Sequence, residues 1–243
     1  MKDQLIVTVI YSVLFLSLFA IGEFLYHKLN FKAESTRKLV HVFTGLICFS
    51  FPIFVSTHWV VLFLTISFAL ILVLSMRFNL LKSINAIERK TSGSFLFPIS
   101  IYVMYWAYSI FGQGNFTGND LVWTSSSDLY GLLGDKAGIY YFLPLLIFSI
   151  SDPLAAMCGK KWPYGKYSIR KETKTFLGST AFLLSSITIS FVFLVNQSSN
   201  FSMALLFSVF LGIGTTAAEG ISQKGFDNLF IPIAAIAILI LLR

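Results

Sequence analysis

Residues 139–157 read IYYFLPLLIFSISDPLAAM, a stretch that stays apolar almost to its end. A membrane-spanning helix needs roughly 20 apolar residues, so this stretch predicts a transmembrane helix. Asp152 then lies within the span and is expected to face a polar cavity or a partner, because a carboxylate in lipid costs about 2.5–3.5 kcal/mol. An interfacial ion pair with Lys160 or Lys161 is the alternative for this acid. Pro153 disturbs the preceding helical turn and is expected to free carbonyl groups to line a site.

The composition of the whole chain is that of an integral membrane protein. Of its 243 residues, 56% are hydrophobic and 12% are charged, and the mean hydropathy is +0.79. Soluble domains are far less apolar. We therefore predict an all-α, polytopic membrane protein whose single domain occupies residues 1–243 and crosses the bilayer about eight times. The expected spans are residues 5–26, 39–55, 58–76, 95–112, 139–157, 176–195, 201–218 and 229–242; the second and last are short, so the count is open by one.

Lys and Arg residues are distributed asymmetrically over the predicted connections. Those after the first, third, fifth and seventh spans hold all of the 18 Lys and Arg residues except Lys2, Lys136 and Arg243. Because cytoplasmic loops carry an excess of Lys and Arg, we expect these connections in the cytoplasm and both termini outside. Topology and anionic lipid headgroups explain the net charge of +7, so no nucleic-acid partner is expected. The expected location is a bacterial plasma membrane, with the site on the cytoplasmic face.

Three acids and an amide lie at the predicted cytoplasmic ends of spans five, seven and eight. They are Asp152, Glu219, Asp227 and Asn228. If these ends converge, their oxygen atoms suit Mg²⁺, which keeps some of its waters while it bridges phosphate groups. For Asp227 or Asn228, capping of the last helix is the alternative interpretation.

Two predicted helix starts combine a Lys with hydroxyl groups and a glycine. They are Lys90, Thr91, Gly93 and Ser94 before the fourth span, and Lys174, Thr175, Gly178 and Ser179 before the sixth. Free N–H groups at a helix start favour anions, so each is a candidate phosphate site, together with Lys160 and Lys161 in the basic connection. A plain helix cap beside a Lys that sets topology explains each pattern equally well.

Arg37, His41 and Gly45 follow one another at intervals of four residues, so they share one helix face, with Lys38 beside it. This face is too polar for lipid. We interpret Arg37 and Lys38 as a phosphate clamp, and His41 as a proton carrier or hydrogen-bond donor. The alternative for His41 is an interfacial histidine that is hydrogen-bonded to a neighbouring backbone group.

Taken in order, these motifs resemble the CTP-dependent polyprenol kinases, a family that includes dolichol kinase, phytol kinase and the yeast-type diacylglycerol kinase. The resemblance covers most of the chain after the first span. Its blocks are Glu34, Thr36, Arg37, Lys38, His41 and Gly45; Glu88, Arg89, Lys90, Thr91, Gly93, Ser94 and Pro98; Ser151, Asp152, Pro153, Ala155, Ala156, Gly159 and Gly165; Lys174, Thr175, Gly178, Ser179 and Ala181; and Glu219, Asp227, Asn228 and Pro232. Leu177 and Phe226 stand where the family usually has acids, which leaves fewer carboxylates for metal.

The resemblance implies a membrane enzyme that transfers a phosphoryl group from CTP to a lipid alcohol. Its implied partners are the nucleotide, the alcohol and the surrounding membrane lipids, and a homo-oligomer is left open. Asp152, Glu219 and Asp227 would hold Mg²⁺ on the nucleotide phosphates, while Lys174 and Ser179, with Arg37 and Lys38, offset charge on the transferring group. His41 or Asp152 would take the proton of the hydroxyl.

Two alternatives stay open. A phosphatidate cytidylyltransferase also joins CTP, Mg²⁺ and a membrane lipid, but its usual Gly, His, Gly, Gly run followed by two aspartates has no counterpart in this chain. A transporter also uses a proline-broken span and an intramembrane acid. Transport needs polar groups along a path open to both faces, whereas the charged candidates here gather on one side.

Overall fold

The computed structural model describes residues 2–86, 92–112, 138–169, 172–197 and 200–242. Its elements are α1 (Lys2–Lys28), α2 (Ala33–Phe49), α3 (Phe51–Phe54), α4 (His58–Arg77), α5 (Lys82–Asn85), α6 (Gly93–Gly112), α8 (Ile139–Leu146), a π-helical segment (Ile147–Ser151), α9 (Asp152–Lys161), β1 (Lys166–Ile169), β2 (Glu172–Thr175), α10 (Phe176–Gln197), α11 (Phe201–Ile221) and α12 (Asp227–Leu241). The predicted all-α, polytopic class is confirmed. The antiparallel hairpin of β1 and β2, which pairs Lys166 with Thr175, was not predicted.

Among the described residues, seven helices are long and apolar enough to cross a membrane. The eighth predicted span corresponds to α12, which has only 15 residues. The second predicted span begins earlier than expected, because the helical segment runs from Ala33 to Phe54 and includes the whole polar face around His41.

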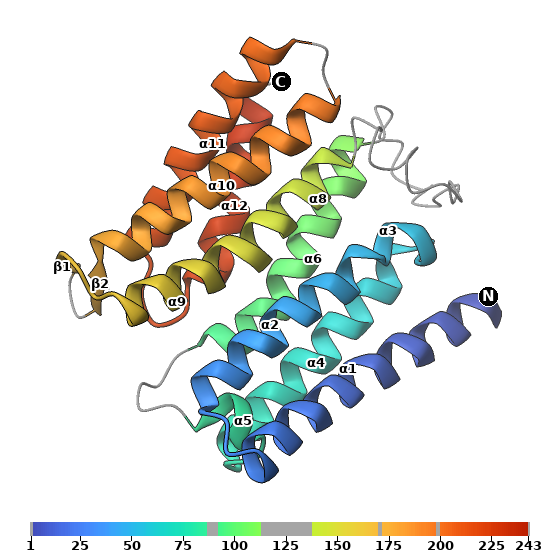
Figure 1. Ribbon diagram of the computed structural model, residues 1–243. Helices are drawn as coiled ribbons and strands as arrows, with labels where there is room; N and C mark the ends of the chain where they lie inside the picture. Colours follow the sequence, from blue (N-terminus) through green and yellow to red (C-terminus); the bar gives the residue numbers. More distant parts are fainter. Residues whose placement is uncertain (1, 87–91, 113–137, 170–171, 198–199, 243) are drawn as a thin grey trace.

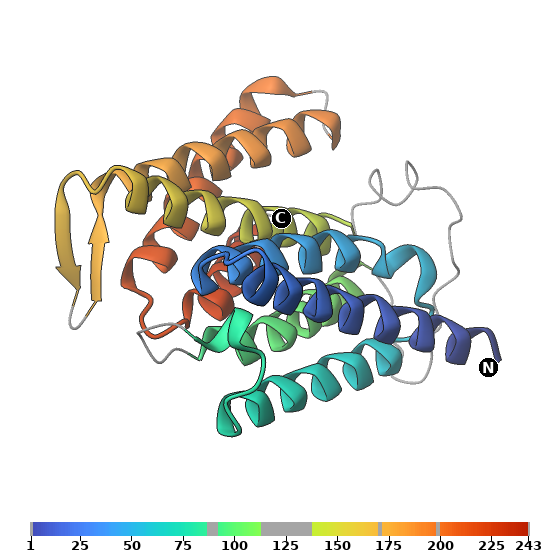
Figure 2. The same ribbon diagram turned by 60° about the horizontal axis from the view of Figure 1, so that its bottom comes forward.

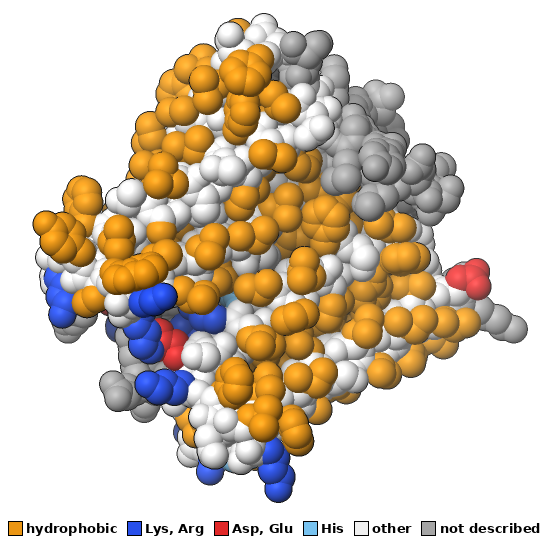
Figure 3. Space-filling model, in the orientation of Figure 1, with side chains coloured by type: hydrophobic (Ala, Val, Ile, Leu, Met, Phe, Trp, Pro, Cys, Tyr) orange, Lys and Arg blue, Asp and Glu red, His pale blue; other side chains and the backbone are white. Residues whose placement is uncertain are grey.

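The helices run side by side, and the basic connections gather at one end of the bundle. The links from α1 to α2 and from α11 to α12, together with the hairpin, lie at this end, and the start of α1 and the end of α12 lie at the other (Figures 1 and 2). Figure 3 shows the same asymmetry as a group of Lys and Arg side chains at the lower left of a mainly hydrophobic surface. Both ends of the chain therefore share one face of the bundle, and which side of the membrane that face meets stays a prediction.

The helix that carries Asp152 is the most enclosed span. It runs through α8, the π-helical segment and α9, and Tyr141, Phe142 and Leu143 are completely buried in it. Because neighbouring helices surround this helix, the Asp152 carboxylate lies inside the protein rather than against lipid, as an intramembrane acid requires. The disturbed turn expected before Pro153 is the π-helical segment, a feature that is frequent at functional sites.

Candidate active site

Asp152 forms a buried ion pair with a lysine from a distant helix. Its Oδ2 atom accepts a hydrogen bond of 2.7 Å from Nζ of Lys38 on α2, and the two side chains are 7% and 15% exposed. The pairing suggested for Lys160 or Lys161 is wrong in this structure. Lys160 instead pairs with Glu34, and the ammonium group of Lys161 lies over the ring of Trp162, 4.5 Å from its centre.

The residues that share the polar face of α2, as their four-residue spacing predicts, pack against the helix that carries Asp152. His41 donates from Nε2 to the carbonyl oxygen of Phe148 at 3.2 Å, because a carbonyl can only accept. In a π-helical turn this carbonyl would pair with the residue five positions on, but that residue is Pro153, which has no N–H. His41 therefore supplies the missing donor and supports the backbone that places Asp152. This bond agrees with the backbone-bonded alternative for His41, and its role as a proton carrier stays a prediction.

Gly45 allows the close approach of α2 to the π-helical segment, and this contact yields a stability prediction. A Cβ atom at Gly45 would lie 2.1 Å from Oγ and 2.6 Å from Cβ of Ser149. Gly45→Ala is therefore expected to lower the free energy of unfolding by about 1–3 kcal/mol through overpacking. Thermal unfolding in detergent measures the loss. Gly220→Ala is the control, because its Cβ would meet only the Tyr167 hydroxyl, at 3.9 Å. Equal stability of the two variants would contradict the contact.

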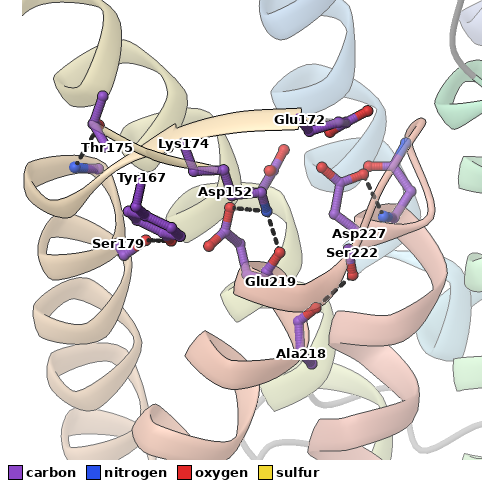
Figure 4. Close-up of polar contacts among 12 residues, drawn as sticks. Asp152, Tyr167, Glu172, Lys174, Thr175, Ser179, Ala218, Glu219, Ser222 and Asp227 are labelled. Carbon is purple, nitrogen blue, oxygen red and sulfur yellow. Dashed lines mark hydrogen bonds and ion pairs between the residues drawn. The ribbon is translucent and has the colours of Figure 1, made fainter. Parts of the chain in front are cut away.

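A second buried ion pair joins the hairpin to α11. Nζ of Lys174, in β2, lies 2.6 Å from Oε1 of Glu219 and also donates to the backbone carbonyl of Glu219 (Figure 4). The other carboxylate oxygen of Glu219, Oε2, is buried and accepts no hydrogen bond from the described residues. Glu219 therefore presents one partnered and one unpartnered oxygen, and the second is suited to a cation.

The remaining residues at the start of α10 serve the local structure. Oγ1 of Thr175 accepts from the backbone N–H of Gly178 at 3.1 Å, so this N–H is used by a helix cap rather than left for an anion. Gly178 packs closely on α9, since a Cβ atom there would lie 3.0 Å from the Ala155 carbonyl oxygen. The Ser179 hydroxyl is 2.6 Å from the hydroxyl of Tyr167 in β1. These contacts agree with the cap interpretation and leave Lys174 as the cation of this block.

At the start of α12, Asp227 faces the site, and its neighbour Asn228 connects α12 to α6. Oδ1 of Asp227 accepts from the backbone N–H of Asn228 at 2.9 Å, but the N-cap residue of α12 is Phe226 and no described side chain caps this helix start, so the capping alternative is wrong. The amide nitrogen of Asn228 donates to the Gly93 carbonyl at 2.5 Å, which ties α12 to the start of α6. The Asp227 carboxylate also lies within electrostatic range of Asp152, Lys38 and Lys174. Asp227 is thus placed to act in the site, whereas the Asn228 side chain has a structural partner.

Of the block before the fourth span, Gly93 and Ser94 are described by the structure, whereas Lys90 and Thr91 lie outside the described residues. Ser94 lines an apolar cavity, and its hydroxyl donates to the sulfur of Met76 at 3.6 Å. The structure therefore separates Ser94 from Lys174 and its neighbours.

Two hollows meet at the basic end of the bundle. The polar pocket has a volume of about 720 Å³, within the usual range for ligand sites. The apolar cavity runs from the same end into the bundle between α1, α2, α4 and α6. The lining of the polar pocket includes Lys160, Glu172, Lys174 and Glu219. The lining of the apolar cavity includes Phe15, Phe51, Leu64, Phe68, Phe97 and Ile101. Four residues line both hollows: Arg37, Lys38, Asp152 and Asp227. The four shared residues are all charged, so a charged boundary separates the polar pocket from the apolar cavity.

The acids around the polar pocket form only part of a metal site. Within the described ranges, no three His, Cys, Asp or Glu side chains are grouped closely enough to hold an ion among themselves. Lys38 and Lys174 already occupy one oxygen each of Asp152 and Glu219. Mg²⁺ commonly takes one or two carboxylates and completes its shell with waters and phosphates, and the unpartnered oxygen of Glu219 fits that chemistry. The predicted metal set of Asp152, Glu219, Asp227 and Asn228 stays a prediction.

The sequence analysis missed the contribution of the hairpin to the site. Glu172, in β2, lines the polar pocket, and its Oε1 atom accepts from the backbone N–H of Lys224 at 2.5 Å. Together with Lys174, it ties the hairpin to the α11 end of the pocket. The signal in the sequence was weak: Gly165, which adopts a positive φ of 66°, precedes two strands of only four residues each.

Fold and site together define an α-helical, polytopic membrane protein in which a charged pocket meets an apolar cavity at one end of the bundle. A phytol kinase from Synechocystis sp. is 24% identical to this chain over 203 residues, which cover 84% of this chain and 77% of that protein. No family model matches the chain. No solved structure matches it either. The similarity supports the resemblance to the polyprenol and phytol kinases at a distant level, and it supports a membrane-bound lipid-alcohol kinase in general.

Proposed function

We propose that this chain transfers the γ-phosphoryl group of CTP to the hydroxyl of a lipid alcohol, such as a polyprenol, a phytol-like alcohol or a diacylglycerol, at the cytoplasmic face of the membrane. One observation carries the proposal: the polar pocket and the apolar cavity share Arg37, Lys38, Asp152 and Asp227. A lipid kinase must bring a water-soluble nucleotide and a membrane-embedded hydroxyl to one point. A charged boundary between two such hollows meets that need.

The nucleotide phosphates would lie in the polar pocket, where cations line the walls. Lys160 and Lys174 each bind a carboxylate in this structure, and Lys38 binds Asp152. Phosphate oxygens form strong charge-assisted hydrogen bonds with such groups. A lysine that exchanges its carboxylate for a phosphate would keep a partner for its own charge, and the released carboxylate would become available to Mg²⁺.

The residues that would hold Mg²⁺ are Glu219, through its unpartnered Oε2, and Asp227. When bound, Mg²⁺ offsets negative charge on the nucleotide phosphates. Release of Lys174 from Glu219 would make its cation available to those phosphates. Phosphoryl transfer depends mainly on positioning and electrostatic stabilisation, so these side chains supply most of what the reaction requires.

Asp152 would accept the proton, and its position in the lining of both hollows supports this role. The alcohol oxygen forms a bond to the γ-phosphorus as the bond from this phosphorus to the β,γ-bridging oxygen breaks, and CDP leaves. The hydroxyl proton passes to the Asp152 carboxylate. Lys38 and Arg37 offset charge on the transferring group, and Lys38 also orients the carboxylate through their 2.7 Å contact.

The alternatives differ in what they require of the site. A phosphatidate cytidylyltransferase would bind a lipid phosphate where the kinase binds a hydroxyl, and the same cations suit either. A transporter would need a polar path through the bundle, whereas the hollow that leads inward from the charged boundary has a largely apolar lining. The apolar character of this hollow supports an enzyme that works at one face.

The test uses purified protein in detergent, Mg²⁺, and CTP labelled at either the γ- or the α-phosphate. The alcohols are farnesol, phytol, undecaprenol and diacylglycerol, with phosphatidate as the substrate of the rival reaction. The expected result is a γ-labelled lipid phosphate together with CDP. An α-labelled CDP-lipid with released pyrophosphate would show the cytidylyltransferase instead. Absence of product from every lipid, while the protein remains folded, would count against both enzymes.

A further inference from the structure

The apolar cavity ends at a break between two helices. Ser50 separates α2 from α3, and the hydroxyl of Tyr11, on α1, lies 2.6 Å from the Ser50 hydroxyl. Phe51, the first residue of α3, lines the cavity just beyond this break and is 1% exposed. The break thus directs a large, buried ring into the far end of the cavity.

Hydrogen bonds hold the backbone around this break in place. The Tyr141 hydroxyl donates to the Cys48 carbonyl at 2.7 Å, and the Tyr105 hydroxyl donates to the Val55 carbonyl at 3.0 Å. These contacts come from α8 and α6. These hydrogen bonds anchor the backbone on both sides of α3, at the end of the cavity.

Aromatic rings close this end of the cavity. The Phe51 ring meets the Tyr11 ring edge to face, with 4.8 Å between ring centres, and it meets the Phe15 ring in the same way at 6.2 Å. Phe15 in turn contacts Phe68 of α4 at 5.0 Å. Edge-to-face contacts of this kind favour one arrangement of the rings over others. A hydrocarbon chain that advances along the cavity therefore meets Phe51 backed by Phe15.

The length of the cavity matches one lipid leaflet. Its lining along α2 runs from Arg37 to Cys48, a rise of about 16 Å at about 1.5 Å per residue. The hydrocarbon core of a bilayer is about 30 Å thick, so one leaflet accounts for about 15 Å. A lipid alcohol with its hydroxyl at Asp152 would place the end of a leaflet-length tail near Phe51.

We propose that Phe51, backed by Phe15, is the stop that sets the longest tail this enzyme accepts. The occupant of the apolar cavity is the hydrocarbon tail of the alcohol substrate, so the inference rests on the proposed function and adds a limit on substrate length. Tails up to about the thickness of one leaflet fit between Asp152 and Phe51. Longer polyprenols must leave part of the tail outside and lose the contacts that position the hydroxyl.

The test compares kcat/KM for linear prenols that increase by one isoprene unit at a time. In the wild-type protein, kcat/KM is expected to fall by about tenfold or more at the first prenol whose tail is longer than the cavity. Phe51→Ala moves this fall to a longer tail by at least one unit. Phe63→Ala is the matched control, because Phe63 lies on α4 but is 60% exposed, and its length profile stays that of the wild type. An unchanged profile in folded Phe51→Ala overturns the proposal.

Two further variants and a cross-linking experiment keep the proposal testable if Phe51→Ala does not fold. Phe51→Leu replaces the ring with a smaller side chain and is expected to extend the accepted tail length, by less than Phe51→Ala does. Thr65→Leu adds volume to the cavity lining and is expected to shorten it. An alcohol with a photoreactive group at the end of its tail tests the geometry without turnover: cross-links at α3 and at Phe15 support the stop, and cross-links confined to lipid-facing residues overturn it. Cross-linking at the stop without phosphorylation of any alcohol would defeat the proposed function alone.

Discussion

Asp152→Asn is expected to lower the rate of phosphoryl transfer by about 10²–10⁴-fold, the usual contribution of a positioned acid or base. The substitution keeps the shape of the side chain but removes the proton acceptor at the boundary of the two hollows. It also leaves the Lys38 ammonium, 2.7 Å away, without its counter-charge. Initial rates with γ-labelled CTP and a lipid alcohol measure the loss, and kcat should fall more than the affinity for CTP.

The control for Asp152→Asn separates chemistry from folding. Removing one member of a buried ion pair can cost about 3–5 kcal/mol, so a loss of activity alone is ambiguous. The double variant Lys38→Met with Asp152→Asn removes both charges and is expected to recover stability without activity. Asp3→Asn, an exposed acid at the opposite end of the bundle, should leave both unchanged. Wild-type rates in folded Asp152→Asn would exclude this carboxylate from the reaction.

Lys174→Ala is expected to weaken CTP binding and also to destabilise the protein. The lysine is a cation of the polar pocket, and hydrogen bonds to charged groups contribute about 1.5–3 kcal/mol, so Kd should rise by about tenfold or more. Its removal strands the Glu219 carboxylate, whose side chain is 11% exposed, at a cost of about 3–5 kcal/mol in stability. Equilibrium binding of CTP and thermal unfolding measure the two effects separately.

A double-mutant cycle resolves the two roles of Lys174. Glu219→Gln removes the stranded charge, so Lys174→Ala with Glu219→Gln is expected to recover much of the stability lost in Lys174→Ala. Weak CTP binding should persist, because the cation is still missing. Restoration of wild-type affinity in the double variant would show that Lys174 only holds the hairpin to α11 and does not bind phosphate.

Much of the fold was predictable, because the membrane restricts what an apolar chain can form. Long hydrophobic runs must be helical, since a bilayer offers the backbone no water to bind, and the eight predicted runs all correspond to helices. The distribution of Lys and Arg predicted which connections lie together. The hairpin at 166–175 was missed because its two short strands lie in a basic connection, where neither hydropathy nor charge indicates strands.

The sequence indicated which residues lie in the candidate site better than it indicated which of them contact one another. Asp152 was singled out because an acid within a span needs a polar environment, and it lies at the boundary of the two hollows. The alternative interpretation paired it with Lys160 or Lys161, which are near it in the chain, but its partner is Lys38, which is distant in the chain. Spacing identifies residues that share a helix face, and it does not say which other helix that face meets. Likewise, Asn228 matched an oxygen-ligand pattern, yet its amide binds a backbone carbonyl of α6.

The short length of α12 has a consequence for where the reaction would take place. Its 15 residues rise about 22 Å, well below the roughly 30 Å of a bilayer hydrocarbon core. A bilayer beside so short a hydrophobic helix thins locally. Asp227, at the start of α12, then lies deeper than the headgroups farther from the protein, and a nucleotide that binds as proposed would have to descend to it. An alcohol with little polar surface could then be phosphorylated at the depth that its hydroxyl group occupies in the bilayer, without moving toward the aqueous phase.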